Sequence, residues 1–127
     1  VPVKILYQYM QAFDICVMPY PWTDHYAYKM SPLKMFEYMA SKTPIIATDL
    51  PVVEEVLKNE DNCIFVKPGD SEDLARGINL LLHNPNLAAK ISRKAFADVK
   101  NHYTWRARAV KISAKVANLY NGQFLPK

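Results

Sequence analysis

The stretch that decides the fold runs from Ser31 to Asp49 and reads SPLKMFEYMASKTPIIATD. It predicts a short helix, a tight turn and a buried strand. Ser31 suits the N-cap, because its hydroxyl can accept a hydrogen bond from a free amide of the first turn. Pro32 suits the first helical position, where its missing N–H costs nothing. Such a helix start offers unpaired N–H groups to a phosphate, and Glu37 on the same helix offers a carboxylate to sugar hydroxyls. The combination indicates a nucleotide or nucleotide-sugar site.

The composition is that of a globular protein. The chain has 127 residues, of which 50% are hydrophobic and 22% are charged, which suits one domain with its own core rather than disorder. No apolar run approaches the roughly 20 residues of a membrane span. We expect no signal peptide within these residues, and Val1 at the first position suggests a piece of a longer protein. Cys16 and Cys63 lack metal-ligand spacing, so we expect buried thiols, with a disulfide as the less favoured alternative.

Charge is distributed unevenly along the chain. Residues 1–84 hold 7 Lys/Arg and 11 Asp/Glu, whereas residues 85–127 hold 9 Lys/Arg and a single acid. A basic segment of this kind can meet an anionic surface, or it can be the solvated face of a helix. Arg108, Lys111 and Lys115 recur at spacings of three and four, which places them on one helical face. We therefore expect a peripheral contact with an anionic membrane, and no nucleic-acid partner.

Short apolar runs alternate with helical patterns along the chain. Such alternation predicts an α/β fold with a parallel sheet, whose ligands sit beyond the carboxyl ends of the strands. Ser71 and Thr104 are the expected N-caps of two helices, and Trp105 is expected to anchor the last helix in the core. The predicted strands are 15–18, 45–48 and 63–66, and the predicted helices are 3–12, 32–41, 52–58, 71–83, 85–100 and 104–120, with a loop over 19–30.

Several motifs, in a fixed order, resemble a known family. The stretch Ser31-Pro-Leu-Lys-Met-Phe-Glu-Tyr-Met-Ala, followed by Thr43-Pro-Ile-Ile-Ala-Thr-Asp-Leu-Pro, resembles the donor-binding motif of family 4 (group 1) retaining glycosyltransferases of the GT-B fold. Further resemblances are carried by Phe13-Asp-Ile-Cys-Val-Met-Pro-Tyr, by Val66-Lys-Pro-Gly-Asp and by Tyr103-Thr-Trp. Together they cover about residues 1–115.

The resemblance implies a Rossmann-like parallel sheet flanked by helices. Residues 1–127 would be a single partial domain, the later part of the nucleotide-sugar-binding domain, with the acceptor domain absent. The implied enzyme is a hexosyltransferase-type glycosyltransferase of polysaccharide biosynthesis. It would move a sugar from a UDP- or GDP-sugar to a glycan or lipid-linked acceptor with retention, without cofactor or metal. We expect a cytoplasmic location, at the inner face of the membrane, and no turnover by this chain alone.

The resemblance also assigns residue roles. Glu37 would accept hydrogen bonds from the ribose hydroxyls, and the start of its helix would bind the diphosphate. Lys29 stands where the family has the first acid of its Glu-x7-Glu motif, and it could supply a positive charge instead. We find no nucleophile with an adjacent base, so no catalytic residue is assigned. The implied donor-binding residues are Ser31, Pro32, Leu33, Lys34, Glu37, Lys29 and Thr48.

Two other interpretations stay open at this level. Glu37 and Lys34 can be an ordinary surface pair on a helix. Lys29 in place of an acid also fits a non-catalytic nucleotide-binding or regulatory α/β domain. A receiver-like domain is disfavoured, because the first 19 residues hold one acid, Asp14, rather than an acidic cluster.

The predicted loop 19–30 is rich in rings. Trp22 and Tyr28 lie among further Tyr, Asp and His residues, including Tyr20, Asp24 and His25. Rings beyond a strand end suit stacking on a sugar or a base, and they equally suit packing against another domain.

Overall fold

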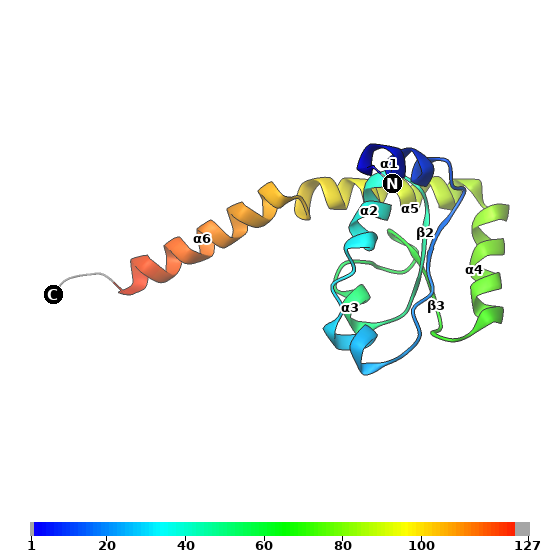
Figure 1. Cartoon of the computed structure of the whole chain (residues 1–127), viewed down its shortest axis with the longest axis horizontal. Coiled ribbons are helices and arrows are strands. Elements are labelled where there is room, and N and C mark those ends of the chain that lie inside the picture. Colours follow the sequence, from blue (N-terminus) through cyan, green and yellow to red (C-terminus); the bar gives the residue numbers. More distant parts are fainter. Residues whose placement is uncertain (1, 124–127) are drawn as a thin grey trace.

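The chain alternates short strands with helices, as its apolar runs predict (Figure 1). The computed structural model describes residues 2–123. Its elements are α1 (Val3–Gln11), β1 (Cys16–Met18), the π-helical turn η1 (His25–Lys29), α2 (Leu33–Ser41), β2 (Ile45–Thr48), α3 (Pro51–Glu54), β3 (Ile64–Val66), α4 (Ser71–His83), α5 (Pro85–His102) and α6 (Trp105–Gln123).

Two predicted segments differ from the structure. The segment 19–30 is not wholly irregular, because η1 forms within it. The helix expected over 52–58 is shorter, since α3 ends at Glu54. Beyond it, the side-chain Oδ1 of Asn62 accepts the Lys58 N–H at 2.7 Å. This bond offers the backbone an alternative to further helix and fixes a turn before β3.

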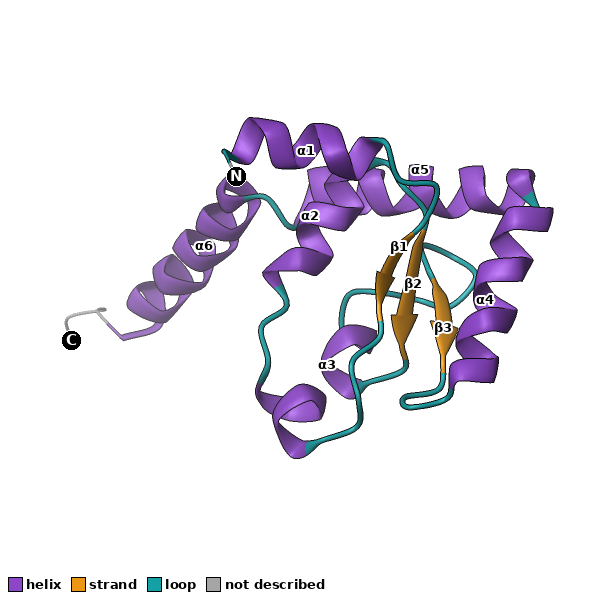
Figure 2. Ribbon diagram, turned by 45° about the vertical axis from the view of Figure 1, so that its right-hand side comes forward, coloured by secondary structure: helices purple, strands orange, loops and turns teal. Residues whose placement is uncertain are grey.

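The three strands form one parallel sheet in the order β1-β2-β3. Met18 at the end of β1 is paired with Ala47, and Thr48 at the end of β2 is paired with Val66 at the end of β3. The carboxyl ends of the strands therefore share one edge, which Figure 2 shows as the arrowheads pointing the same way. The expected Rossmann-like α/β class is confirmed.

Side chains of β2 alternate between two hydrophobic clusters. Ile45 and Ala47 are buried among residues of α2, α3 and α5, whereas Ile46 is buried with residues of β3, α4 and α5. Helix α4 approaches the sheet closely at Gly77, where an added Cβ would lie 2.9 Å from a methyl carbon of Val66. Both faces of the sheet are thus covered, as a parallel sheet requires.

Helix α5 lies across the end of the sheet at which the strands begin (Figures 1 and 2). It packs against both α2 and α4. Ile91 belongs to the cluster on the α4 side, whereas Ala95 and Val99 belong to the cluster on the α2 side. One helix therefore contributes to the core on both faces of the sheet.

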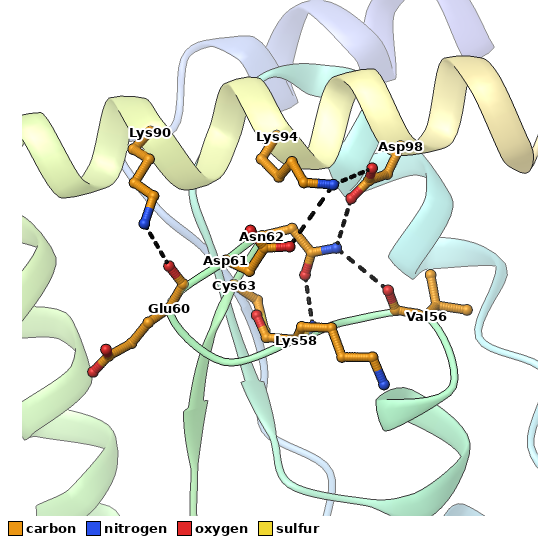
Figure 3. Close-up of polar contacts among 9 residues, drawn as sticks. All are labelled: Val56, Lys58, Glu60, Asp61, Asn62, Cys63, Lys90, Lys94 and Asp98. Atoms are coloured by element: carbon orange, nitrogen blue, oxygen red, sulfur yellow. Dashed lines mark hydrogen bonds and ion pairs between the residues drawn. The ribbon is translucent and has the colours of Figure 1, made fainter.

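A buried polar group fastens α5 to the turn before β3 (Figure 3). The Asn62 side chain is 2% exposed. Its Nδ2 donates to Oδ2 of Asp98 at 3.0 Å and to the Val56 carbonyl at 3.3 Å. The Nζ of Lys94 donates to the other oxygen of Asp98 at 2.6 Å. We call Asn62, Lys94 and Asp98 the Asn62 cluster; each buried polar atom in it has a partner, as the low-dielectric interior demands.

The caps of two helices can be compared with prediction. Ser71 is not the N-cap of α4; Asp70 is, and its carboxylate accepts the Asp73 N–H at 2.9 Å. A carboxylate suits this place because it also meets the positive end of the helix dipole. The prediction for α6 is confirmed, since Oγ1 of Thr104 accepts the Ala107 N–H at 3.1 Å.

Cys16 and Cys63 are free and buried, as expected. Burial raises the pKa of the Cys63 thiol to about 12.

Helix α6 extends away from the rest of the structure (Figure 1). Trp105 at its start is 81% exposed. The prediction that Trp105 anchors this helix in the core is wrong, because the chain turns at Tyr103 and leads α6 off the body. Within residues 2–123, no helix has the length and apolarity needed to cross a bilayer.

Candidate functional site

A cavity of about 220 Å³ opens where the three strands end. Thr48 lies in its wall and is 3% exposed. Its Oγ1 donates to the Met18 carbonyl of the neighbouring strand at 3.4 Å, so the hydroxyl keeps only its lone pairs for a ligand. None of the candidate donor-binding residues on α2, namely Leu33, Lys34 and Glu37, lines this cavity. Its wall is formed by Pro19, Thr48, Val66, Lys67, Gly69, Asp70, Ser71 and Leu74.

The N-cap of α2 is not the residue that the sequence predicts. The helix begins at Leu33, its N-cap is Pro32, and no side chain caps this end, so Ser31 is not the N-cap. The Leu33 amide donates to the Ser31 carbonyl at 2.9 Å, and the Met35 amide donates to the Pro32 carbonyl at 3.0 Å. Among the described residues the Lys34 amide has no such acceptor. An uncapped start leaves N–H capacity for an external anion.

Lys34 and Glu37 are both exposed on α2. The residues that anchor the helix are Met35 and Met39, which are 1% and 0% exposed. No ion pair joins Lys34 to Glu37 within the part of the chain that the structure describes. The simple surface-pair interpretation therefore has no support from the side-chain geometry, and the Glu37 carboxylate has its oxygens available for hydrogen-bond donors.

Lys29 is the last residue of η1 and is exposed. Only Met30 and the Ser31–Pro32 pair separate it from α2 in the chain. Its ammonium group can therefore add positive charge near the start of that helix.

A second cavity, of about 310 Å³, borders the start of α2. Phe36 of α2 and Tyr103 at the end of α5 have ring centroids 5.3 Å apart on its wall. Lys111 lies over the Tyr103 ring, with its Nζ 6.0 Å from the centroid. The lining contains no acid. It is formed by Leu33, Phe36, His102, Tyr103, Thr104, Trp105, Arg108 and Lys111.

Sequence reasoning missed this cavity. It assigned Arg108 and Lys111 to a membrane face, although both also line the same cavity as Leu33. Their spacing on one helical face was the available signal, but only the turn after α5 brings that face to α2. Of the candidate residues on α2, Leu33 lines this cavity with Arg108 and Lys111, whereas Lys34 and Glu37 line neither of the two cavities. The uncapped helix start and these cations can bind a phosphate-bearing ligand.

The three-stranded parallel sheet flanked by helices has the α/β fold of the C-terminal domains of GT-B proteins. The chain belongs to the family of glycosyl transferases group 1, whose model matches residues 1–98.

Solved structures agree with this family. Sucrose-phosphate synthase from Thermosynechococcus elongatus superposes with a TM-score of 0.73 at 25% identity, over 91% of this chain and 27% of that one. The C-terminal domain of a group 1 glycosyl transferase, LpcC, from Francisella tularensis gives a TM-score of 0.63 at 26% identity, over 76% of this chain and 47% of that one. HepE from Anabaena, solved with UDP-glucose, superposes with a TM-score of 0.65 at 22% identity, over 91% of this chain and 29% of that one. At this identity the similarity is one of fold.

The chain is short beside its relatives. It spans between 12% and 20% of the length of the curated glycosyltransferases that it matches, at 29–38% identity.

Proposed function

We propose that this chain is the later part of the donor-binding domain of a retaining glycosyltransferase. The substrate is a nucleotide sugar, a UDP- or GDP-sugar, and the acceptor is a glycan or a lipid-linked glycan. The observation that carries the proposal is the uncapped start of α2 with an available Lys34 amide, followed on the same helix by the exposed, unpaired Glu37.

The residues of α2, together with Lys29 before it, would each bind a different part of a nucleotide sugar. The helix start and the ammonium groups of Lys29 and Lys34 bind the diphosphate, since N–H groups and cations favour that anion. The Glu37 carboxylate accepts hydrogen bonds from the ribose hydroxyls. HepE, which shares the fold, was solved with UDP-glucose, and this supports a UDP-sugar as the first donor to test.

The proposed chemical role of these residues is to stabilise negative charge. In the transfer, the bond between the sugar C1 and the diphosphate oxygen breaks, and the electron pair leaves with the diphosphate. A bond from the acceptor hydroxyl oxygen to C1 forms on the same face, and the hydroxyl proton is released. The helix start and the lysines stabilise the negative charge that develops on the leaving diphosphate.

The test is donor binding by the complete protein. Glu37→Ala is expected to weaken UDP binding by roughly 1–3 kcal/mol, because hydrogen bonds to a charged group are lost. Glu37→Gln keeps one acceptor oxygen and is expected to lose less. Glu72, exposed in the first turn of α4, gives the matched control Glu72→Gln. Calorimetric titration with UDP and GDP measures all four proteins, and unchanged affinity in both Glu37 variants would remove this residue from the site.

A non-catalytic nucleotide-binding domain is the second candidate, favoured by Lys29 at the position of an acid. It predicts UDP or GDP binding without either sugar transfer or donor hydrolysis in the complete protein. Detection of either reaction excludes it.

We also propose a peripheral membrane contact, at the inner face of the membrane, for the basic face of α6. Lys94 and Lys90 are engaged within the fold, by Asp98 and by the Glu60 carbonyl. Arg108, Lys111 and Lys115 are exposed, and each charge near an anionic surface contributes about 1 kcal/mol. Sedimentation with phosphatidylserine vesicles should therefore fall when all three are changed to Gln. Equal binding at low salt would return them to an ordinary solvated face.

A further inference from the structure

The segment between β1 and α2 holds aromatic side chains that form an inner and an outer pair. The inner pair, Tyr20 and Tyr26, stacks with ring centroids 5.1 Å apart and packs against the core cluster on the α2 side. The outer pair, Trp22 and Tyr28, is 55% and 64% exposed. Its ring centroids are 6.4 Å apart and the ring planes meet at 89°. The inner pair anchors the segment, and the outer pair faces solvent.

Tyr28 lies in the ordered turn η1, and Trp22 directly precedes the hydrogen-bonded residues that lead into it. The Thr23 carbonyl accepts the Ala27 amide at 2.8 Å, and the Thr23 hydroxyl accepts the Tyr26 amide at 3.2 Å. Ala27 is 0% exposed, and η1 packs against α3. A π-helical turn is rare, and such turns are frequent at functional sites. The backbone that carries the two large rings is therefore ordered before any ligand arrives, and the rings contact each other, which lowers the ordering cost of binding.

The shape of the outer pair selects a class of ligand. Two perpendicular rings form a corner, with the face of one ring as a floor and the other ring as a wall. A pyranose has an apolar C–H face that packs on an aromatic ring, and it has hydroxyls around its rim. Asp24 and His25, both exposed, lie between the two rings in the chain and offer hydrogen-bond partners for such hydroxyls. A flat base would be better served by parallel rings on its two faces.

The position of the pair fits the transfer reaction. Figure 2 shows η1 beyond the end of the sheet at which the strands finish, and α2 follows it in the chain. We propose that Trp22 and Tyr28 form a stacking platform for a pyranose ring of the substrate. The inference rests on the proposed function, because it names the part of the site that holds sugar rather than nucleotide. The pyranose belongs either to the donor or to the acceptor, and the experiment separates these sources.

The experiment titrates the complete protein with four probes: UDP, UDP-glucose, maltose and cellobiose. Trp22→Ala is expected to weaken binding of a pyranose-bearing probe about tenfold, by loss of the ring face. Trp22→Phe keeps a ring and should retain most of the affinity. Tyr9, on α1 beyond the opposite end of the sheet and 59% exposed, gives the control Tyr9→Ala. Melting temperatures of the variants check that each is folded.

Each outcome decides the proposal. Loss of disaccharide binding with unchanged UDP affinity supports a platform for the acceptor. Loss of UDP-glucose affinity with unchanged UDP affinity supports a platform for the donor sugar. Equal losses for UDP and UDP-glucose mean that the rings stack on the base, and they overturn the proposal. Unchanged binding of every probe, or no binding of any pyranose probe by the wild-type protein, overturns it too. UDP binding by the wild type tests the donor site separately, so the two proposals can fail independently.

Discussion

Replacement of Asn62 by Ala is expected to destabilise the protein by about 3 kcal/mol. The side chain makes three hydrogen bonds, with the Lys58 amide at 2.7 Å, the Val56 carbonyl at 3.3 Å and Asp98 at 3.0 Å. A typical intramolecular hydrogen bond contributes about 0.5–1.5 kcal/mol net, and a buried group left without a partner costs about 1–3 kcal/mol. Because Asn62 is only 2% exposed, water can restore few of these bonds.

Urea unfolding followed by circular dichroism measures the change. The control is Asn79→Ala, at an exposed position on α4. That change should be neutral or slightly stabilising, because Ala is the better helix former. The m-value should be the same in all proteins, so that midpoints report stability alone. A loss below about 0.5 kcal/mol for Asn62→Ala would refute the claim that the Asn62 cluster holds α5 to the turn before β3.

Three further outcomes are expected. Gly77→Ala should destabilise by about 1–3 kcal/mol in the same urea assay, because its Cβ would lie 2.9 Å from Val66 and overpack α4 against β3; an unchanged midpoint would show that the helix shifts freely. Burial opposes ionisation of Asp98, yet hydrogen bonds from Lys94 and Asn62 hold its pKa below the usual 3.8. The carboxylate therefore contributes stability above that value and loses it as pH falls through the lower folded pKa, so the stability cost of Asp98→Asn should be full at about pH 6 and should shrink as the pH is lowered below the usual value; a cost that stays constant over this range would contradict this. Cys63, with its pKa raised to about 12 by burial, should resist iodoacetamide at about pH 8 until urea is added, and rapid labelling of the folded protein would contradict its burial.

The sheet could be predicted because each of its strands coincides with a short apolar run in the sequence. Ile45 to Thr48 is an apolar run between a proline and an acid, and the structure places β2 over these residues. The N-cap of α4 was harder to predict, since Asp70 and Ser71 are adjacent and both suit an N-cap. Which one serves depends on backbone dihedral angles, and Asp70 is the residue with an extended backbone. Residue preference alone could not make that choice.

Part of the candidate site could also be predicted from local sequence, and part depends on how distant elements pack. The start of α2 and Glu37 are contiguous in sequence, so local reasoning could group them. The cavity that joins Leu33 to Arg108 and Lys111 could not be predicted, because it depends on how far α5 runs and where the chain turns after it. The error at Trp105 has the same origin. A large ring at a helix start is usually buried, but its burial depends on the direction that the helix takes.

Helix α5 has a consequence for how the protein melts. It supplies Ile91 to the hydrophobic cluster on one face of the sheet and Ala95 and Val99 to the cluster on the other, and β2 likewise faces both. Neither cluster can lose its packing while the other stays whole, because the same helix and strand would have to leave both. We therefore expect the two faces to unfold in one cooperative transition. In calorimetry the van't Hoff enthalpy of the main transition should equal the measured enthalpy, with α6 fraying separately at lower temperature.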